Sequence, residues 1–133
     1  MTYVVAYIAT AVVFLGIDAL WLSKIALGMY QKELGSLLLE KPNLAVAGAF
    51  YLLYVGGIVI LAVMPALAEG NWVKALLFGA VLGLVAYGTY DITNLSTLKG
   101  WSVQLALIDI AWGTALTAVS ATAGYWVVKA LNL

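Results

Sequence analysis

Four long apolar stretches dominate this sequence, at about residues 3–22, 44–64, 73–92 and 102–128. A helix needs roughly 20 mainly apolar residues to cross the hydrocarbon core of a bilayer, where it satisfies its own backbone hydrogen bonds. The short connections after the second and third stretches make consecutive helices antiparallel neighbours. The sequence therefore predicts an all-α integral membrane protein, a four-transmembrane-helix antiparallel bundle forming a single domain over residues 1–133.

The composition agrees and excludes several classes of function. The chain is 65% hydrophobic and 9% charged, against about 25% charged in an average soluble domain. Its formal net charge is zero, so we expect no nucleic-acid partner. It has no Cys and no His, which removes thiol chemistry, imidazole bases and the usual ligands of zinc and haem. We expect no cofactor and no metal. The N-terminal stretch lacks the basic region of a signal peptide, so it is expected to stay as the first span.

The connection between the first two spans, residues 24–41, has helical amphipathic spacing. Its apolar positions are Ile25, Met29, Tyr30, Leu34, Leu37 and Leu38. Its polar positions are Lys32, Glu33, Ser36, Glu40 and Lys41. Such a pattern is typical of a helix that lies in the membrane interface. The alternative is an ordinary loop with one helical turn.

Three aspartates, Asp18, Asp91 and Asp109, lie inside or at the end of these apolar stretches. A carboxylate in hydrocarbon costs several kcal/mol and is rarely there without a role. When the chain is followed back and forth across the membrane, all three come near the side of the first and third connections. Carboxylates clustered in a medium of low dielectric cannot all ionise cheaply. We therefore expect a shared proton or, as a minor alternative, a bound Mg²⁺ or Ca²⁺.

Two faces of small residues lead to these aspartates at helical spacing. On the third span the face is Ala75, Gly79, Gly83, Tyr87 and Asp91, and on the fourth it is Asp109, Gly113, Thr117, Ser120 and Gly124. Small residues allow helices to approach closely in lipid. Asp91 and Asp109 are therefore expected to point into the bundle.

Aromatic and amide side chains surround the three aspartates and complete a candidate binding or proton-coupling site. Its members are Asp18, Asp91, Asp109, Asn94, Tyr87, Tyr90, Tyr54, Trp21 and Trp112. Two Asp-x-x-Trp pairs could frame a cation by charge and ring face. The plainer interpretation is that the tyrosines and tryptophans are interface anchors and that acids at span ends meet water.

The lysines give a weak indication of orientation. Four of them, at positions 24, 32, 41 and 99, lie on the side of the first and third connections, and two, at 74 and 129, lie on the side of the termini. The excess of positive charge on cytoplasmic loops then predicts periplasmic termini.

Five short strings of the sequence resemble one family of small bacterial inner-membrane proteins. They are Asp18-Ala-Leu-Trp21-Leu22, Phe50-Tyr51-Leu-Leu-Tyr54, Tyr87-Gly-Thr-Tyr-Asp91-Ile-Thr-Asn94, Lys99-Gly-Trp101 and Asp109-Ile-Ala-Trp112-Gly113. The family has four predicted spans and is classified only as a domain of unknown function. The resemblance covers nearly the whole chain. It implies a four-helix fold in the bacterial inner membrane and assigns no activity to any residue.

Three functions remain open from the sequence. The first is a proton- or cation-coupled carrier or binding protein for a small molecule, which as a carrier would need a homodimer. The second is an enzyme that modifies a lipid or isoprenoid by Asp acid–base chemistry. The third is an accessory subunit of a larger membrane complex. The expected partners are the lipid bilayer, a lipid or small amphipathic ligand, and a second copy or a complex subunit.

Overall fold

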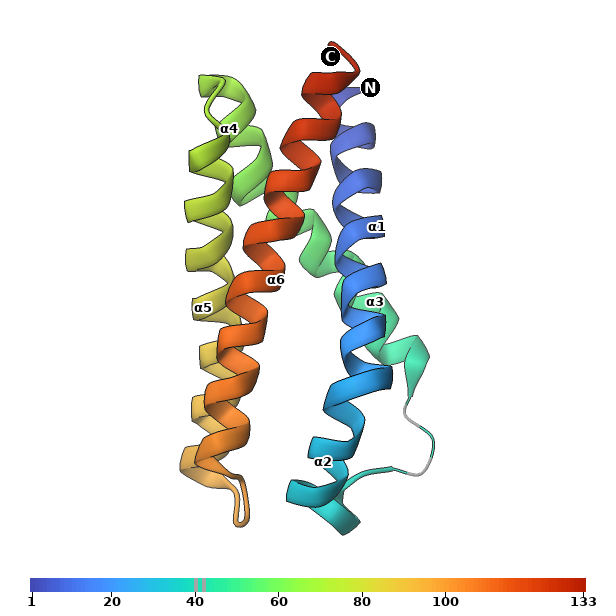
Figure 1. The fold of residues 1–133 in the computed structure, drawn as a ribbon, viewed down its shortest axis with the longest axis vertical. Helices are drawn as coiled ribbons and strands as arrows, with labels where there is room; N and C mark the ends of the chain where they lie inside the picture. The colour runs from blue at the N-terminus through green and yellow to red at the C-terminus, as the bar shows by residue number, and fades with distance from the viewer. Residues whose placement is uncertain (40, 42) are drawn as a thin grey trace.

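A computed structural model of the protein describes residues 1–39, 41 and 43–133, which are almost entirely helical and contain no strand. Four helical stretches are long and apolar enough to cross a membrane, which confirms the predicted fold class. They are Thr2–Leu37, Leu44–Glu69, Trp72–Thr97 and Val103–Ala130. Both ends of the chain lie at the same end of the bundle (Figure 1). We call this the terminal end and the opposite end the loop end.

The first helical stretch continues without a break into the amphipathic segment. It consists of α1 (Thr2–Trp21), a π-helical turn (Leu22–Ala26), α2 (Leu27–Leu34) and a 3₁₀ turn (Gly35–Leu37). Figure 1 shows α2 at the loop end, below α1. The sequence predicts the amphipathic helix correctly but not its continuity with the first span.

The two faces of α2 differ in burial. Tyr30 and Leu34 are half-buried against the bundle, whereas Lys32 is exposed. Ile25 and Leu37, which the sequence assigns to the apolar face, are 59% and 65% exposed. They depart from the pattern because the π turn and the 3₁₀ turn that hold them do not keep the α-helical period. A position of α2 in the membrane interface stays a prediction.

The second stretch consists of α3 (Leu44–Ile58), a π-helical turn (Val59–Val63) and α4 (Met64–Glu69). The sequence predicts that this span ends near Pro65, and the helix itself continues past Pro65 to Glu69. A proline lacks the N–H of an α-helix and its ring collides with the carbonyl four residues earlier. The wider π turn that ends at Val63, just before Met64 and Pro65, has hydrogen bonds spanning five residues, so it accommodates the ring and the helix continues. Glu40 and Pro42, predicted in the amphipathic segment and at the start of this span, lie outside the described residues.

The last two helices are longer than the spans 73–92 and 102–128 expected from their apolar residues. α5 covers Trp72–Thr97 and α6 covers Val103–Ala130. Hydropathy marks only the part of a helix that lies in hydrocarbon, so a polar last turn escapes it. The Ser96 hydroxyl in that turn donates to the carbonyl one turn back at 2.7 Å. The connections are correspondingly shorter than predicted.

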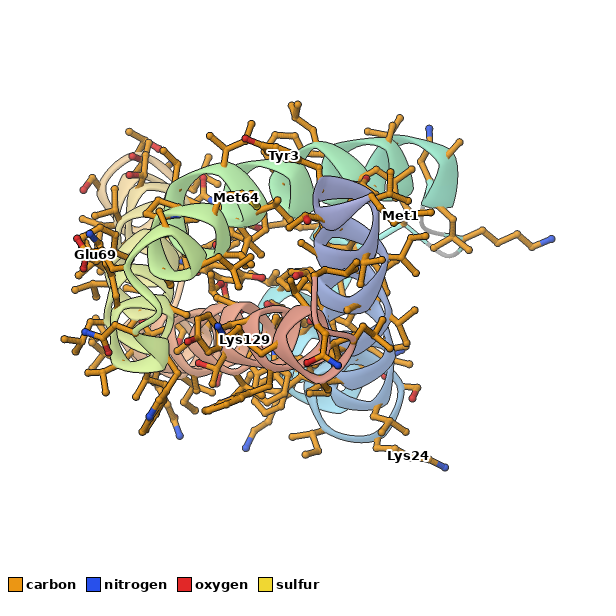
Figure 2. All side chains as sticks on the ribbon, turned by 90° about the horizontal axis from the view of Figure 1, so that it is seen from above. Met1, Tyr3, Lys24, Met64, Glu69 and Lys129 are labelled. Carbon is orange, nitrogen blue, oxygen red and sulfur yellow. The ribbon has the colours of Figure 1, made fainter. Side chains whose placement is uncertain are left out.

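The four stretches do not pack evenly around the bundle. α6 contacts both α5 and α1, and the second stretch crosses the bundle at an angle (Figure 1). Its first part, α3, packs against α1, whereas its π turn and α4 pack against α5. Seen from the terminal end, α4 lies over α5 and α3 extends toward α1 (Figure 2). As a result, α3 and α5 diverge toward the loop end.

Glycines bring α5 and α6 into backbone contact. A Cβ atom on Gly83 would fall on the carbonyl oxygen of Gly113, and one on Gly113 would fall on the ring of Tyr87. A Cβ on Gly79 would lie 2.9 Å from the Cα of Ala118. Both predicted small-residue faces are thereby confirmed. Their buried members are Ala75, Gly79, Gly83, Asp91, Asp109, Gly113, Thr117, Ser120 and Gly124.

We expect Gly83→Ala to destabilise the protein by about 1–3 kcal/mol or more, because the added methyl overlaps the backbone of α6 and forces the two helices apart. Gly88→Ala on the same helix is the matched control, since a Cβ there meets nothing within 4 Å. It should leave stability unchanged or raise it by up to about 1 kcal/mol through helix propensity. Thermal unfolding followed by circular dichroism in detergent measures both. Equal unfolding temperatures for the two variants would contradict this packing.

Candidate functional site

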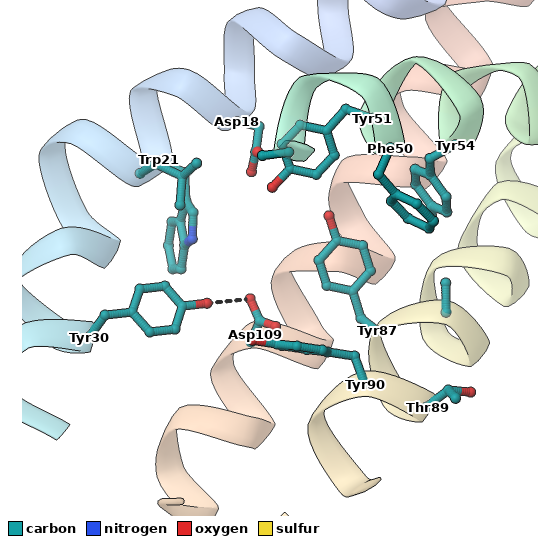
Figure 3. Close-up of a pocket in the computed structure, with 13 residues that line it drawn as sticks. Asp18, Trp21, Tyr30, Phe50, Tyr51, Tyr54, Tyr87, Thr89, Tyr90 and Asp109 are labelled. Carbon is teal, nitrogen blue, oxygen red and sulfur yellow. Dashed lines mark hydrogen bonds between the residues drawn. The ribbon is translucent and has the colours of Figure 1, made fainter. Parts of the chain in front are cut away.

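A pocket of about 520 Å³ lies in the loop-end half of the bundle, where α3 and α5 diverge. All four helical stretches contribute to its walls. It is lined by Asp18, Trp21, Leu22, Tyr30, Ala47, Phe50, Tyr51, Tyr54, Ala86, Tyr87, Thr89, Tyr90 and Asp109 (Figure 3). Six of the nine predicted site residues are among them: Asp18, Asp109, Tyr87, Tyr90, Tyr54 and Trp21.

Two carboxyl groups face each other across this space. Asp18 comes from the last turn of α1 and Asp109 from the second turn of α6, and each is 5% exposed. In Figure 3 they lie above and below the centre, with Trp21 on one side of the space between them and Tyr87 on the other. No lysine lines the pocket. The one ion pair within the described part of the chain joins Lys74 to Glu69, so the protein supplies no cation to either acid there.

Tyr30 is one of several pocket residues absent from the predicted site, and it is the one that bonds an acid directly. Its hydroxyl donates to the carboxyl of Asp109 at 3.0 Å. The sequence interpretation places it only on the apolar face of the amphipathic segment. The π turn after α1 turns α2 so that Tyr30 meets α6, and such turns have no sequence signature that would place the ring. The one sequence signal that Tyr30 packs against the bundle is its position on the apolar face of α2, since an apolar face needs a surface to pack on.

Trp21 and Trp112 form a stacked pair beside Asp18. Their ring centroids are 4.4 Å apart and their planes differ by 10°. The indole N–H of Trp112 donates to the carboxyl of Asp18 at 3.2 Å. The members of the two Asp-x-x-Trp pairs therefore interact between helices: Trp112, one turn beyond Asp109 on α6, bonds Asp18 on α1. Trp112 holds Trp21 and Asp18 in place without lining the pocket itself.

α3 contributes two tyrosines, Tyr51 and Tyr54, whose rings pack against Phe14 of α1. The fully buried ring of Phe14 lies 5.8 Å from Tyr51 and 5.5 Å from Tyr54, centroid to centroid. The Tyr54 hydroxyl shares a 2.9 Å hydrogen bond with the hydroxyl of Thr117. The Tyr51 hydroxyl points toward Asp18 (Figure 3).

α5 contributes the opposite aromatic wall. The Tyr87 ring lies over Gly113, where any side chain would collide with it. The Tyr90 ring packs edge-on against Trp101, with centroids 5.7 Å apart. The position of this wall therefore depends on the glycine faces, because the close approach of α5 to α6 sets how deeply Tyr87 lies in the pocket.

Asp91 occupies a different position from the other two acids. It is fully buried and does not line the pocket. Neither of its carboxyl oxygens has a hydrogen-bond donor among the described residues. Asp109 is the neighbouring acid, and no hydrogen bond joins the two carboxyls in this structure. Asn94, one turn further, is half-buried and outside the pocket lining, so its role stays a prediction.

The donor set of this site is carboxyl and phenol oxygen. Within residues 1–39, 41 and 43–133, no three His, Cys, Asp or Glu side chains gather as metal ligands would. The site offers negative charge, aromatic faces and hydroxyl donors in an apolar enclosure. Such a site can hold a cation, move a proton between carboxyls or orient a polar head group.

Comparison with known proteins then gives the family. A family model described as "Predicted membrane protein (DUF2177)" matches residues 3–126. The chain belongs to this family. The DUF2177 match covers every residue of the pocket, and with the four apolar helices it makes the chain a multi-pass membrane protein of unknown function. No curated protein and no solved structure matches the chain.

In this DUF2177 protein, we expect Tyr30→Phe to loosen α2, because the variant loses the hydroxyl that bonds Asp109. The loss should lower the local opening free energy of α2 by about 1–3 kcal/mol. Amide hydrogen exchange in detergent measures it. Tyr3→Phe is the control, since Tyr3 is 63% exposed at the terminal end. Unchanged exchange of α2 in Tyr30→Phe would show that the contact carries no energy.

Proposed function

We propose that this protein binds a small amphipathic molecule in the acid-lined pocket, and that the binding is coupled to protons as in a small membrane carrier. The observation that carries the proposal is the pairing of Asp18 and Asp109 across an apolar, aromatic space without a protein cation. Burying a carboxylate that has no compensating charge is expensive. Each carboxylate therefore needs a proton or a positively charged ligand.

Asp91 supports the proton part of the proposal. As an ionised group it would be buried with no donor among the described residues, at a cost of several kcal/mol. A proton held between Asp91 and Asp109 supplies that donor and removes one charge. A ligand that needs the charge of Asp109 must then displace this proton or compete with it. Competition of that kind couples ligand occupancy to protons.

Tight helix contacts in the terminal half of the bundle support a pocket that opens only in the loop-end half. The contacts at Gly79 and Gly124 leave no room for an extra methyl group there. A binding protein needs no further opening. A carrier would have to open this half, and we propose a homodimer as the assembly in which the helices could rearrange.

A lipid- or isoprenoid-modifying enzyme is the second candidate, and the divergence of α3 and α5 favours it. A substrate could keep its tail in the bilayer while its head reached Asp109, the acid or base in such a reaction. Asp91 would then hold or return the proton.

We also propose a bacterial inner-membrane location with the termini on the periplasmic side. The support is the distribution of lysines, which places four on the loop end and two on the terminal end.

Asp109→Asn tests the proposed function. We expect the variant to fold and to lose the small molecules that the wild-type protein retains in a native mass spectrum, by about tenfold or more in occupancy. Glu69→Gln is the control, because Glu69 is an acid outside the pocket that pairs with Lys74. The same retained mass in both variants at acidic and neutral pH argues against pocket binding. If Asp109→Asn changes only the composition of the lipid extract, the result supports the enzyme hypothesis. If the variant loses a protein partner that the wild type retains, the result supports the role of an accessory subunit.

Orientation is tested by single cysteines, since the chain has none. Thr97→Cys lies at the loop end and Leu133→Cys at the terminal end, and both positions are exposed. A membrane-impermeant maleimide added to intact cells should label Leu133→Cys and spare Thr97→Cys. The reverse pattern would place the termini in the cytoplasm.

A further inference from the structure

The pocket has a side opening between two helices. Of its lining residues, Phe50 on α3 and Tyr90 on α5 are the large exposed ones along these helices, at 60% and 53%. Both lie within helices long and apolar enough to span a membrane. α3 packs on α1 while the later part of the same stretch packs on α5, so the gap widens toward the loop end. In a bilayer, an opening between these two apolar helices would face the acyl chains.

The inner end of the pocket has the chemistry of a cation site. Asp18 and Asp109 bring negative charge from opposite sides, and the rings of Trp21 and Tyr87 flank the space between them (Figure 3). An ammonium group is attracted to aromatic faces, most strongly where water is excluded. A sulfate or phosphate head would meet two carboxyls and no lysine. The pocket therefore selects against anionic heads by charge.

The cation site is held rigid before any ligand arrives. Trp112 stacks on Trp21 and donates to Asp18, and Tyr30 donates to Asp109. Each acid thus has one carboxyl oxygen bonded to a protein donor, which fixes the orientation of the carboxyl in the pocket. Preorganised groups reduce the entropy lost on binding, so a head group of matching size gains affinity here.

We infer that the ligand class is a single-chain amphiphile with an ammonium head. The head lies between Asp18 and Asp109, and the chain leaves between Phe50 and Tyr90 into the bilayer. The volume of about 520 Å³ falls within the range of about 300–1,000 Å³ of small-molecule sites. It need not contain the whole ligand, because the chain continues into lipid. This inference deepens the proposed function and rests on it.

The test uses dodecyltrimethylammonium as the probe, with the purified protein in maltoside detergent and binding read from tryptophan fluorescence. Dodecyl sulfate tests the charge of the head, and tetramethylammonium tests the need for a chain. We expect dodecyltrimethylammonium to bind saturably and at least about tenfold more tightly than either. Asp18→Asn and Asp109→Asn should each weaken it by about tenfold. Native mass spectrometry checks that one molecule is bound per chain.

Two further variants test the side opening. Ala86→Trp places an indole in the pocket wall on α5, whereas Val85→Trp adds the same side chain to the neighbouring position, which is 59% exposed and outside the pocket. Ala86→Trp should abolish saturable binding and Val85→Trp should leave it unchanged. Thermal unfolding shows whether each variant is folded, and the aspartate variants remain a test if Ala86→Trp does not fold.

The outcomes separate this inference from the proposed function. Equal binding of dodecyl sulfate, or full affinity in both Asp→Asn variants, overturns the ammonium class while a retained native molecule still supports pocket binding. If tetramethylammonium binds as tightly as dodecyltrimethylammonium and Ala86→Trp has no effect, the chain does not leave between α3 and α5. The ligand class is then a small cation. If no amphiphile binds and no native molecule is retained by the wild-type protein, both proposals fail.

Discussion

The contact between α5 and α6 is the constraint on which the rest of this structure depends. In lipid, helices gain nothing from burying apolar surface against each other, so close packing and interhelical hydrogen bonds must hold them together. Gly83 and Gly113 supply the packing by letting the two backbones touch. The same contact fixes the side chains that follow on each face. Tyr87 lies over Gly113, and Asp91 comes beside Asp109. The polar site is therefore a direct extension of the packing face.

The remaining walls of the pocket come from helices that depart from the regular α-helix. A π turn after α1 directs Tyr30 toward Asp109, and a second π turn before Pro65 lets one stretch contact α1 at one end and α5 at the other. An evenly packed four-helix bundle would fill the space between α3 and α5 with side chains. Here the divergence of α3 and α5 leaves room for a ligand, and the glycine contacts confine that room to the loop end.

The sequence predicted what depends on hydropathy and helical period. The four spans follow from apolar length, and the faces ending in Asp91 and Asp109 follow from small residues at helical spacing. It did not predict what depends on the helical geometry itself. Pro65 favours the end of a helix, and the residues Val59–Val63 alone do not indicate the π turn after which the helix continues to Glu69. Tyr30 was missed because its place depends on such a turn. The bond from Trp112 to Asp18 joins residues far apart in sequence, and no local pattern reports which helix an indole meets.

Because of the π turn at Val59–Val63, the pocket can change while the four-helix fold stays the same. Such a turn accommodates one residue more than an α-helix of equal length. A relative one residue shorter here would still have four spans, the glycine faces and all three aspartates. Yet the early half of its second span would be rotated by about 100° relative to the late half, carrying Tyr51 and Tyr54 away from the carboxyls. A single-codon deletion could thus change what the cavity recognises while every hydropathy profile stayed the same.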